Sequence, residues 1–141
     1  MVDPCIFCGI VAGEVPGQII DSDDHTVAFM DINPATRGHA LVVPREHSAD
    51  LMDISEEDLG NTMLAAQRLA ERISEKLEPK PGGFNILNAC GSAAWQTVFH
   101  FHVHVIPRYD DDPLKLPWVP GPGDEEEIAS VAALLRGGAD E

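Results

Sequence analysis

Short apolar runs separated by polar turns fill the first part of the chain. Three runs have the length and the Val, Ile and Phe content of β-strands, at 18–21, 26–30 and 39–43. The segment Asp31-Ile32-Asn33-Pro34 ends the second run, because Pro34 lacks the N–H group that a sheet needs. The connections between the runs are short, so the pattern predicts antiparallel strands.

A helical period follows these strands. Ser55 is suited to cap a helix N-terminus, and the acidic residues 56–58 complement the positive end of the helix dipole. Apolar residues then recur at helical spacing and predict one buried stripe, formed by Leu59, Met63, Ala66, Ala70, Ile73 and Leu77. Pro79 ends the predicted helix.

Two further strands are predicted after the helix, at about 84–88 and 99–106, with a loop of small residues at 88–97 between them. Short helices are predicted near the two ends, over 5–12 and 125–135. Strands grouped around one long helix predict an α+β fold with a mostly antiparallel sheet. With 141 residues, 44% of them hydrophobic, the chain has the size and composition of one globular domain.

The charge balance narrows the range of partners. Nine Lys and Arg residues stand against 24 Asp and Glu residues, which gives a formal net charge of −15. A surface this acidic repels a phosphate backbone, so a general nucleic-acid binder is not expected. The sequence shows no apolar run near the ~20 residues of a membrane span and no secretory signal, and its three cysteines suit a reducing compartment. We therefore expect a cytoplasmic protein with neither a membrane nor a nucleic-acid partner.

The segment His100-Phe101-His102-Val103-His104-Val105-Ile106 carries the clearest chemical signal. Side chains alternate between the two faces of a strand, so the three histidines would share one face, ~7 Å apart, opposite an apolar face. An imidazole can act as a nucleophile, a proton donor or a metal ligand. A single metal bound by all three is disfavoured, because ~7 Å is long for nitrogens that converge on one ion.

The loop before the histidines offers groups that suit an anion. It contains Asn88, Gln96 and Thr97, whose amides and hydroxyl can act with backbone N–H groups on a phosphate. Small polar residues also make ordinary turns, so the spacing alone does not decide between the two roles.

Cys5 and Cys8 form a Cys-x-x-Cys pair, which is half of a zinc site or a redox pair. The redox interpretation needs a strand before the pair, and none is predicted there. For zinc, His47 and His100 are the candidates for the two further ligands. The alternative is a pair of small buried side chains.

Together these motifs resemble the histidine triad (HIT) superfamily. Its signature is three histidines that alternate with apolar residues, and residues 100–106 match it completely. Four other segments stand in the family's order and spacing: Cys5-Ile6-Phe7-Cys8-Gly9-Ile10, Phe29-Met30-Asp31-Ile32-Asn33-Pro34, Gly38-His39-Ala40-Leu41-Val42-Val43-Pro44 and Gln96-Thr97-Val98-Phe99. The resemblance implies one HIT domain over 1–141, with its core at 5–108 and a variable tail at 109–141. The implied fold is a five-stranded antiparallel sheet with one long helix, usually paired as a homodimer.

The resemblance also implies a reaction on a purine nucleotide. In the family, the middle histidine attacks the α-phosphorus of a nucleotide and forms a nucleotidyl-histidine, which water or another acceptor resolves. His102 matches this nucleophile, His104 a position that binds phosphate or assists proton transfer, and His39 a histidine beside the triad. Asp31 matches the residue that binds the ribose hydroxyls. The other implied contacts are Asn88, Gln96 and Thr97 for the phosphate, and Phe7, Ile10, Phe29 and Ile32 for the base.

Zinc is implied in the same way. Many bacterial members, and the related galactose-1-phosphate uridylyltransferases, bind zinc through Cys-x-x-Cys, a later histidine and the first triad histidine. The matching residues are Cys5, Cys8, His47 and His100. Such a site would be structural, and no organic cofactor is expected. Trp95 departs from the pattern, since much of the family has glycine there.

The intact triad favours an enzyme, a nucleotidyl hydrolase or transferase. Nucleoside phosphoramidates, dinucleoside polyphosphates and aminoacyl adenylates are the candidate substrates. A nucleotide-binding regulatory module with little turnover is one alternative, and a zinc-stabilised interaction protein is another.

Overall fold

A computed structural model describes residues 5–137 of the chain. Five strands form one sheet in the order β1-β2-β3-β5-β4, and every neighbouring pair is antiparallel. The elements in chain order are α1 (Ile6–Ala12), β1 (Ile19–Ser22), β2 (Thr26–Met30), β3 (Ala40–Pro44), α2 (Glu56–Lys76), β4 (Gly83–Leu87), the short 3₁₀ helix η1 (Ser92–Ala94), β5 (Val103–Arg108) and α3 (Glu125–Gly137). The predicted α+β class, the antiparallel sheet and the single long helix are confirmed.

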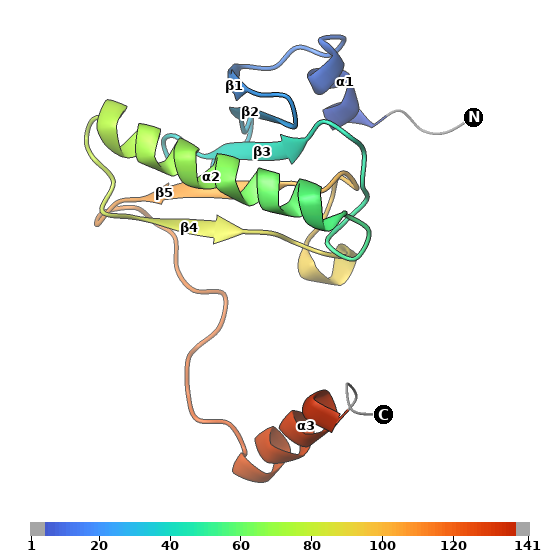
Figure 1. The fold of residues 1–141 in the computed structure, drawn as a ribbon. Helices are drawn as coiled ribbons and strands as arrows, with labels where there is room; N and C mark the ends of the chain where they lie inside the picture. The colour runs from blue at the N-terminus through green and yellow to red at the C-terminus, as the bar shows by residue number, and fades with distance from the viewer. Residues whose placement is uncertain (1–4, 138–141) are drawn as a thin grey trace.

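The two helices α1 and α2 cover opposite faces of the sheet. The long helix α2 lies across one face (Figure 1) and packs its alanines and Leu69 on strand residues that include Val42 and Val103, and on Phe101 just before β5. The short helix α1 packs Phe7 and Ile10 on the other face, against Phe29 and neighbouring strand residues. Alternation along β2, β3 and β5 sends successive side chains to these two layers, as strand geometry requires.

The buried stripe of α2 is shifted from the prediction: among the predicted positions Ala66 is fully buried, and Leu59, Ala70 and Ile73 are partly buried. Its fully buried residues are Thr62, Ala65, Ala66 and Leu69, whereas Met63 is 43% exposed. The stripe follows the spacing of three and four residues, and Met63 lies one position to the side of it. The predicted cap is confirmed, because the Ser55 hydroxyl accepts a hydrogen bond from the Asp58 N–H at 3.1 Å.

The last strand begins at Val103, four residues later than the predicted start at Phe99. The residues before it bond to loops instead of to a neighbouring strand. The Phe101 N–H donates to the Ser48 carbonyl at 2.7 Å, and the Asn88 side chain donates to the His102 carbonyl at 2.9 Å. His100 and His102 therefore precede β5, and only His104 lies within it.

The chain after β5 leaves the sheet. A long connection leads to α3, which lies apart from the sheet in Figure 1, and none of its residues is buried. Within residues 5–137, no helix is both long and apolar enough to cross a membrane. The parts of the structure that surround the histidines are therefore the sheet, α1 and the loops around β5.

Candidate functional site

His102 is fixed in one orientation by its neighbours. Its Nδ1 lies 2.7 Å from the carbonyl oxygen of His100. A carbonyl only accepts hydrogen bonds, so Nδ1 carries the proton and Nε2 keeps its lone pair. The ring of Phe7 meets the His102 ring edge-on, with centroids 5.1 Å apart and planes at 87°. The His100 carbonyl and the Phe7 ring thereby hold the imidazole of His102, and the hydrogen bond from the Asn88 side chain to the His102 carbonyl holds its backbone.

Burial keeps His102 neutral. The residue is only 6% exposed, and this burial lowers the pKa of His102 below its ordinary value, against the opposing effect of the His100 carbonyl. A neutral imidazole with an unprotonated Nε2 is the form that attacks an electrophile. The geometry thus provides a preorganised nitrogen nucleophile.

A second group, beside His102, consists of Asp31, His39 and His104. The His39 Nε2 lies 2.9 Å from the His104 Nδ1 and 3.3 Å from a carboxylate oxygen of Asp31. The rings of His102 and His104 are 5.1 Å apart between centroids, closer than the predicted ~7 Å between strand neighbours. Burial, and then the neighbouring His102 and His39, lower the pKa of His104 to about 4. His104 is therefore neutral at pH 7.

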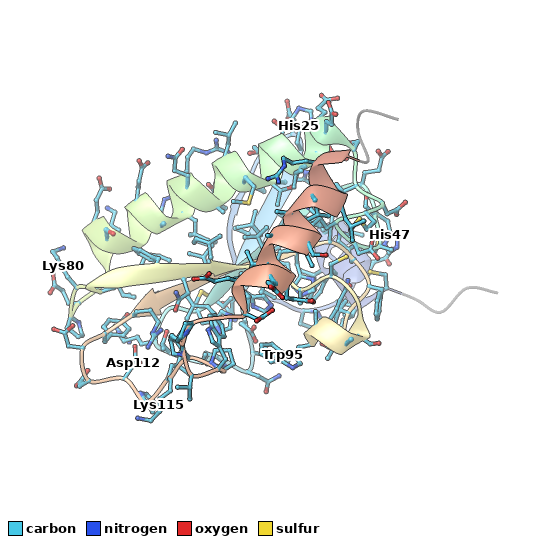
Figure 2. The ribbon with its side chains drawn as sticks, turned by 90° about the horizontal axis from the view of Figure 1, so that it is seen from below. His25, His47, Lys80, Trp95, Asp112 and Lys115 are labelled. Carbon is cyan, nitrogen blue, oxygen red and sulfur yellow. The ribbon has the colours of Figure 1, made fainter. Side chains whose placement is uncertain are left out.

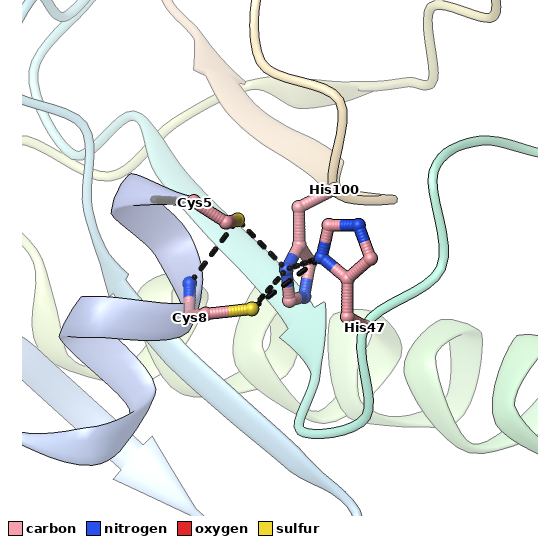
Figure 3. A group of neighbouring side chains, drawn as sticks. All are labelled: Cys5, Cys8, His47 and His100. Atoms are coloured by element: carbon pink, nitrogen blue, oxygen red, sulfur yellow. Dashed lines mark hydrogen bonds between the residues drawn. The ribbon is translucent and has the colours of Figure 1, made fainter. Parts of the chain in front are cut away.

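A third group joins the N-terminus to the histidine segment. Figure 3 shows the sulfur atoms of Cys5 and Cys8 and the Nδ1 atoms of His47 and His100 turned toward one another. The His100 Nδ1 lies 3.3 Å from the Cys5 Sγ, 3.5 Å from the Cys8 Sγ and 3.3 Å from the His47 Nδ1. The Cys8 Sγ lies 3.4 Å from the His47 Nδ1. Two thiols and two imidazoles are the donor set of a tetrahedral zinc site.

The distances and the protonation of this group fit zinc. A tetrahedral ion with Zn–N of about 2.05 Å and Zn–S of about 2.3 Å places its ligand atoms roughly 3.3–3.8 Å apart, as these atoms are. The His100 Nε2 lies 2.9 Å from the Pro44 carbonyl, so it carries the proton and leaves the Nδ1 lone pair toward the group. Burial, and then Cys5, raise the pKa of Cys8 to about 11, so the thiolate form needs a bound cation.

The comparisons with known proteins agree with this geometry. The model of the HIT domain family matches residues 12–111. The chain belongs to the HIT family.

Several HIT relatives resemble the chain over most of its length. Protein hit of Bacillus subtilis is 41% identical over 105 residues, which are 74% of this chain and 71% of that protein. The crystal structure of a Zn-bound histidine triad family protein from Mycobacterium smegmatis matches with a TM-score of 0.74 and 38% identity, covering 97% of both chains. A histidine triad nucleotide-binding protein from Candida albicans matches with a TM-score of 0.84 and 29% identity, covering 97% of this chain and 98% of that one.

The loop predicted to bind phosphate is folded by one of its own residues. The side-chain oxygen of Gln96 accepts the Gly91 N–H at 2.7 Å, and its amide nitrogen donates to the carbonyls of Ala49 and Val98. Gln96 is buried, whereas Thr97 is exposed beside it. In this conformation Gln96 shapes the loop, and Thr97 is the exposed residue of the two. Direct phosphate contact by Gln96, Thr97 and Asn88 stays a prediction.

Trp95 occupies the left-handed region of backbone conformation, with φ at 79°. Glycine adopts this conformation without a steric penalty, and other residues pay roughly 1–2 kcal/mol for it. The turn therefore gives a physical reason for the glycine that much of the HIT family has at this position. The indole is 67% exposed, and Figure 2 shows Trp95 at the rim of the molecule, away from Lys80 at the far end of the sheet.

The residues predicted to hold the base fall into two sets. Phe7, Ile10 and Phe29 belong to the buried cluster under α1, where Phe7 also contacts His102. Ile32 is 84% exposed in the turn after β2. The structure therefore gives the first three a packing role, and their contact with a base stays a prediction.

The sequence did not reveal that Asp31 and His39 contact each other. A signal for this pairing existed, because residues 26–30 and 39–43 were predicted as adjacent antiparallel strands. In the observed register Met30 pairs with Ala40, and the Asp31 N–H donates to the His39 carbonyl at 3.1 Å. Residues that follow and precede a paired position face each other across the start of the turn. Knowledge of the register between these two strands would have predicted this contact, but the hydrophobic pattern alone did not supply the register.

Proposed function

We propose that this HIT protein is a nucleotide hydrolase or nucleotidyl transferase that uses His102 as its nucleophile. The observation that carries the proposal is the bond between the His102 Nδ1 and the His100 carbonyl, which leaves a neutral Nε2 lone pair at a site of low exposure. The family membership and the Candida albicans structural relative, a histidine triad nucleotide-binding protein, support a nucleotide as the ligand.

In the proposed reaction, the His102 Nε2 forms a bond to the α-phosphorus of the nucleotide. The bond from phosphorus to the leaving group breaks, and its electron pair goes to the leaving oxygen or nitrogen. Water or another acceptor then attacks the nucleotidyl-histidine and frees the His102 Nε2. Zinc, when bound by Cys5, Cys8, His47 and His100, supplies a structural crosslink between α1 and the histidine segment.

The remaining predicted residues surround this nucleophile in the proposal. Asp31 accepts hydrogen bonds from the ribose hydroxyls, since its side chain is partly exposed next to the triad. The phosphate is contacted by Asn88, Gln96 and Thr97, and the purine base is contacted by Phe7, Ile10, Phe29 and Ile32. Nucleoside phosphoramidates and dinucleoside polyphosphates are the proposed substrate classes. Because the zinc thiols must stay reduced, we place the protein in the cytoplasm, which cell fractionation would test.

The test compares wild type, His102→Ala and His25→Ala on adenosine 5′-phosphoramidate and on diadenosine tri- and tetraphosphate. His25 is an exposed turn residue and serves as the matched control. We expect His102→Ala to stay folded and to lose at least about a thousandfold in kcat, because the attacking atom is gone. The control should keep wild-type turnover.

Two results would contradict the proposal. Wild-type turnover in His102→Ala would show that another group attacks phosphorus. Nucleotide binding by the folded, zinc-loaded wild type without release of any product would favour a regulatory binding module.

We also propose that the protein is a homodimer. The helix α3 carries Ile128, Val131, Leu134 and Leu135 in exposed positions, so within the described residues 5–137 of one copy these side chains are not covered. A second copy would bury this apolar surface. Sedimentation equilibrium should give twice the chain mass of 15.2 kDa, and a monomer that persists at micromolar concentration would contradict the proposal.

A further inference from the structure

The imidazole of His39 has only one protonation state that satisfies its contacts. Its Nδ1 lies 2.9 Å from the backbone N–H of Ala35, which donates to it. The Nδ1 atom is therefore an acceptor, and the proton of the neutral ring is on Nε2. Burial lowers the pKa of His39, with Asp31 acting in the opposite direction, so the neutral ring is the relevant form.

This protonation state determines that of His104. The proton on the His39 Nε2 points to the His104 Nδ1 at 2.9 Å, which must accept it. The neutral His104 then carries its own proton on Nε2. The opposite arrangement would require a proton on the His39 Nδ1, directly against the donating Ala35 N–H.

Asp31 completes this chain of contacts. One of its carboxylate oxygens accepts the Asn33 N–H at 2.7 Å, which holds the group in place. The other lies 3.3 Å from the His39 Nε2 and 4.0 Å from the His104 Nδ1. The negative charge of Asp31 favours a proton on the His39 Nε2 and keeps the His39 ring turned toward His104.

We propose that Asp31 and His39 are positioning residues that hold His104 as a neutral hydrogen-bond donor at Nε2, directed at the departing group of the nucleotide. The inference rests on the proposed function. The adjacent rings then have complementary roles, because His102 presents a lone pair at Nε2 and His104 presents an N–H. We call the contacts that link Asp31, His39 and His104 the relay, although no proton is transferred along them. The His104 N–H stabilises the charge that develops on the leaving oxygen or nitrogen, and solvent protonates that group afterwards.

This role makes the relay sensitive to the leaving group. A hydrogen bond to the departing atom matters most when that atom leaves as a poor, basic anion, and little when it leaves readily. Two substrates with the same nucleoside therefore test the relay. The phenyl and p-nitrophenyl esters of AMP share the ribose and base, and they differ in the leaving group because phenolate is far more basic than p-nitrophenolate. Any effect of Asp31 on ribose binding cancels in the ratio of their kcat/KM values.

The matched pair of variants is His39→Leu and His39→Gln. Leu removes the donor, whereas the Gln side-chain nitrogen can stand where the His39 Nε2 stands and donate to His104. We expect His39→Leu to lose about 100-fold in kcat on the poorer leaving group and less than about tenfold on p-nitrophenol, with little change in KM. His39→Gln should recover most of the loss, and Asp31→Asn should shift the ratio in the same direction by about tenfold.

A second measurement needs no substrate. Nitrogen-15 NMR of the histidine rings reports which nitrogen of His104 is protonated. We expect the Nε2–H form in wild type and in His39→Gln, and a mixture of forms in His39→Leu. This outcome would support the relay even if none of the chosen nucleotides were hydrolysed, so a failure of the proposed function would be recognised separately. A proton on Nδ1 of His104 in wild type, or equal losses on both substrates in His39→Leu, would overturn the inference.

Discussion

Two side-chain groups flank His102, and they look alike until the protons are placed. Cys5, Cys8, His47 and His100 form one group, and Asp31, His39 and His104 form the other. In each group the possible ligand atoms all lie within 4.8 Å of one another. On distance alone, both are candidate metal sites.

The two groups differ in the backbone group that bonds to the ring nitrogen on the far side of each imidazole. His100 donates its Nε2 proton to the Pro44 carbonyl, so its Nδ1 lone pair faces the cysteines and is available to a cation. His39 accepts the Ala35 N–H at Nδ1, so its Nε2 faces His104 and Asp31 with a proton instead of a lone pair. A backbone carbonyl behind one ring thus prepares a metal ligand, and a backbone N–H behind the other prepares a hydrogen-bond donor.

The largest expected effect of this difference concerns zinc. We expect the wild-type chain to hold one zinc per chain, and Cys8→Ser to hold far less than one. Because the ion would join α1 to the residues that carry His47 and His100, its loss should cost several kcal/mol and lower Tm by about 10 °C. Metal analysis by atomic emission and a thermal scan of each variant give both numbers.

Two matched variants decide whether the comparison holds. Cys90→Ser changes the third cysteine, which lies outside the group, and should keep both the zinc and the wild-type Tm. Asp31→Asn should also keep one zinc per chain, since the second group has no lone pair to offer at the His39 Nε2. Stoichiometric zinc in Cys8→Ser would show that the first group does not hold the ion, and a second zinc in wild type that Asp31→Asn removes would show that the proton assignment at His39 is wrong.

The sequence predicted the fold well, because the fold rests on local patterns. Strand-length apolar runs, the Ser55 cap and the proline that follows the long helix each act within a few residues. The errors arose where a distant segment intervened. The last strand starts late because the Phe101 N–H bonds to Ser48, more than fifty residues earlier in the chain. No local pattern at 99–102 reports that bond.

The candidate site was predicted in part for the same reason. The alternation of residues 100–106 indicated that the three histidines share a face, and motif order grouped Cys5 and Cys8 with His47 and His100. Protonation depends on single backbone groups behind each ring, such as the Pro44 carbonyl and the Ala35 N–H. Those partners are set by turn geometry and register, so the roles of neighbouring histidines required the folded structure.

The smaller expected effect is a pH dependence of stability that comes from the second group. The pKa of His104 is about 4 in the folded chain and near 6.5 when the chain unfolds. Below pH 6.5 the unfolded chain binds a proton that the folded chain does not bind until the pH approaches 4, so acid favours unfolding. Between pH 7 and pH 5 this single residue should remove about 2 kcal/mol from the free energy of unfolding.

Urea unfolding of wild type and His104→Gln at pH 7, 6 and 5, with zinc in excess, measures this contribution. The wild type should lose about 2 kcal/mol more than the variant over this range, because Gln has no proton to gain. Zinc release at low pH affects both proteins equally, since His104 is not a ligand of the zinc group, and therefore cancels in the difference. His25→Gln removes an exposed histidine and should follow the wild type. If wild type and His104→Gln lost stability in parallel, His104 would already be protonated in the folded chain. Its Nδ1 would then be a donor, and the His39 Nε2 would have to be the lone pair that the relay excludes.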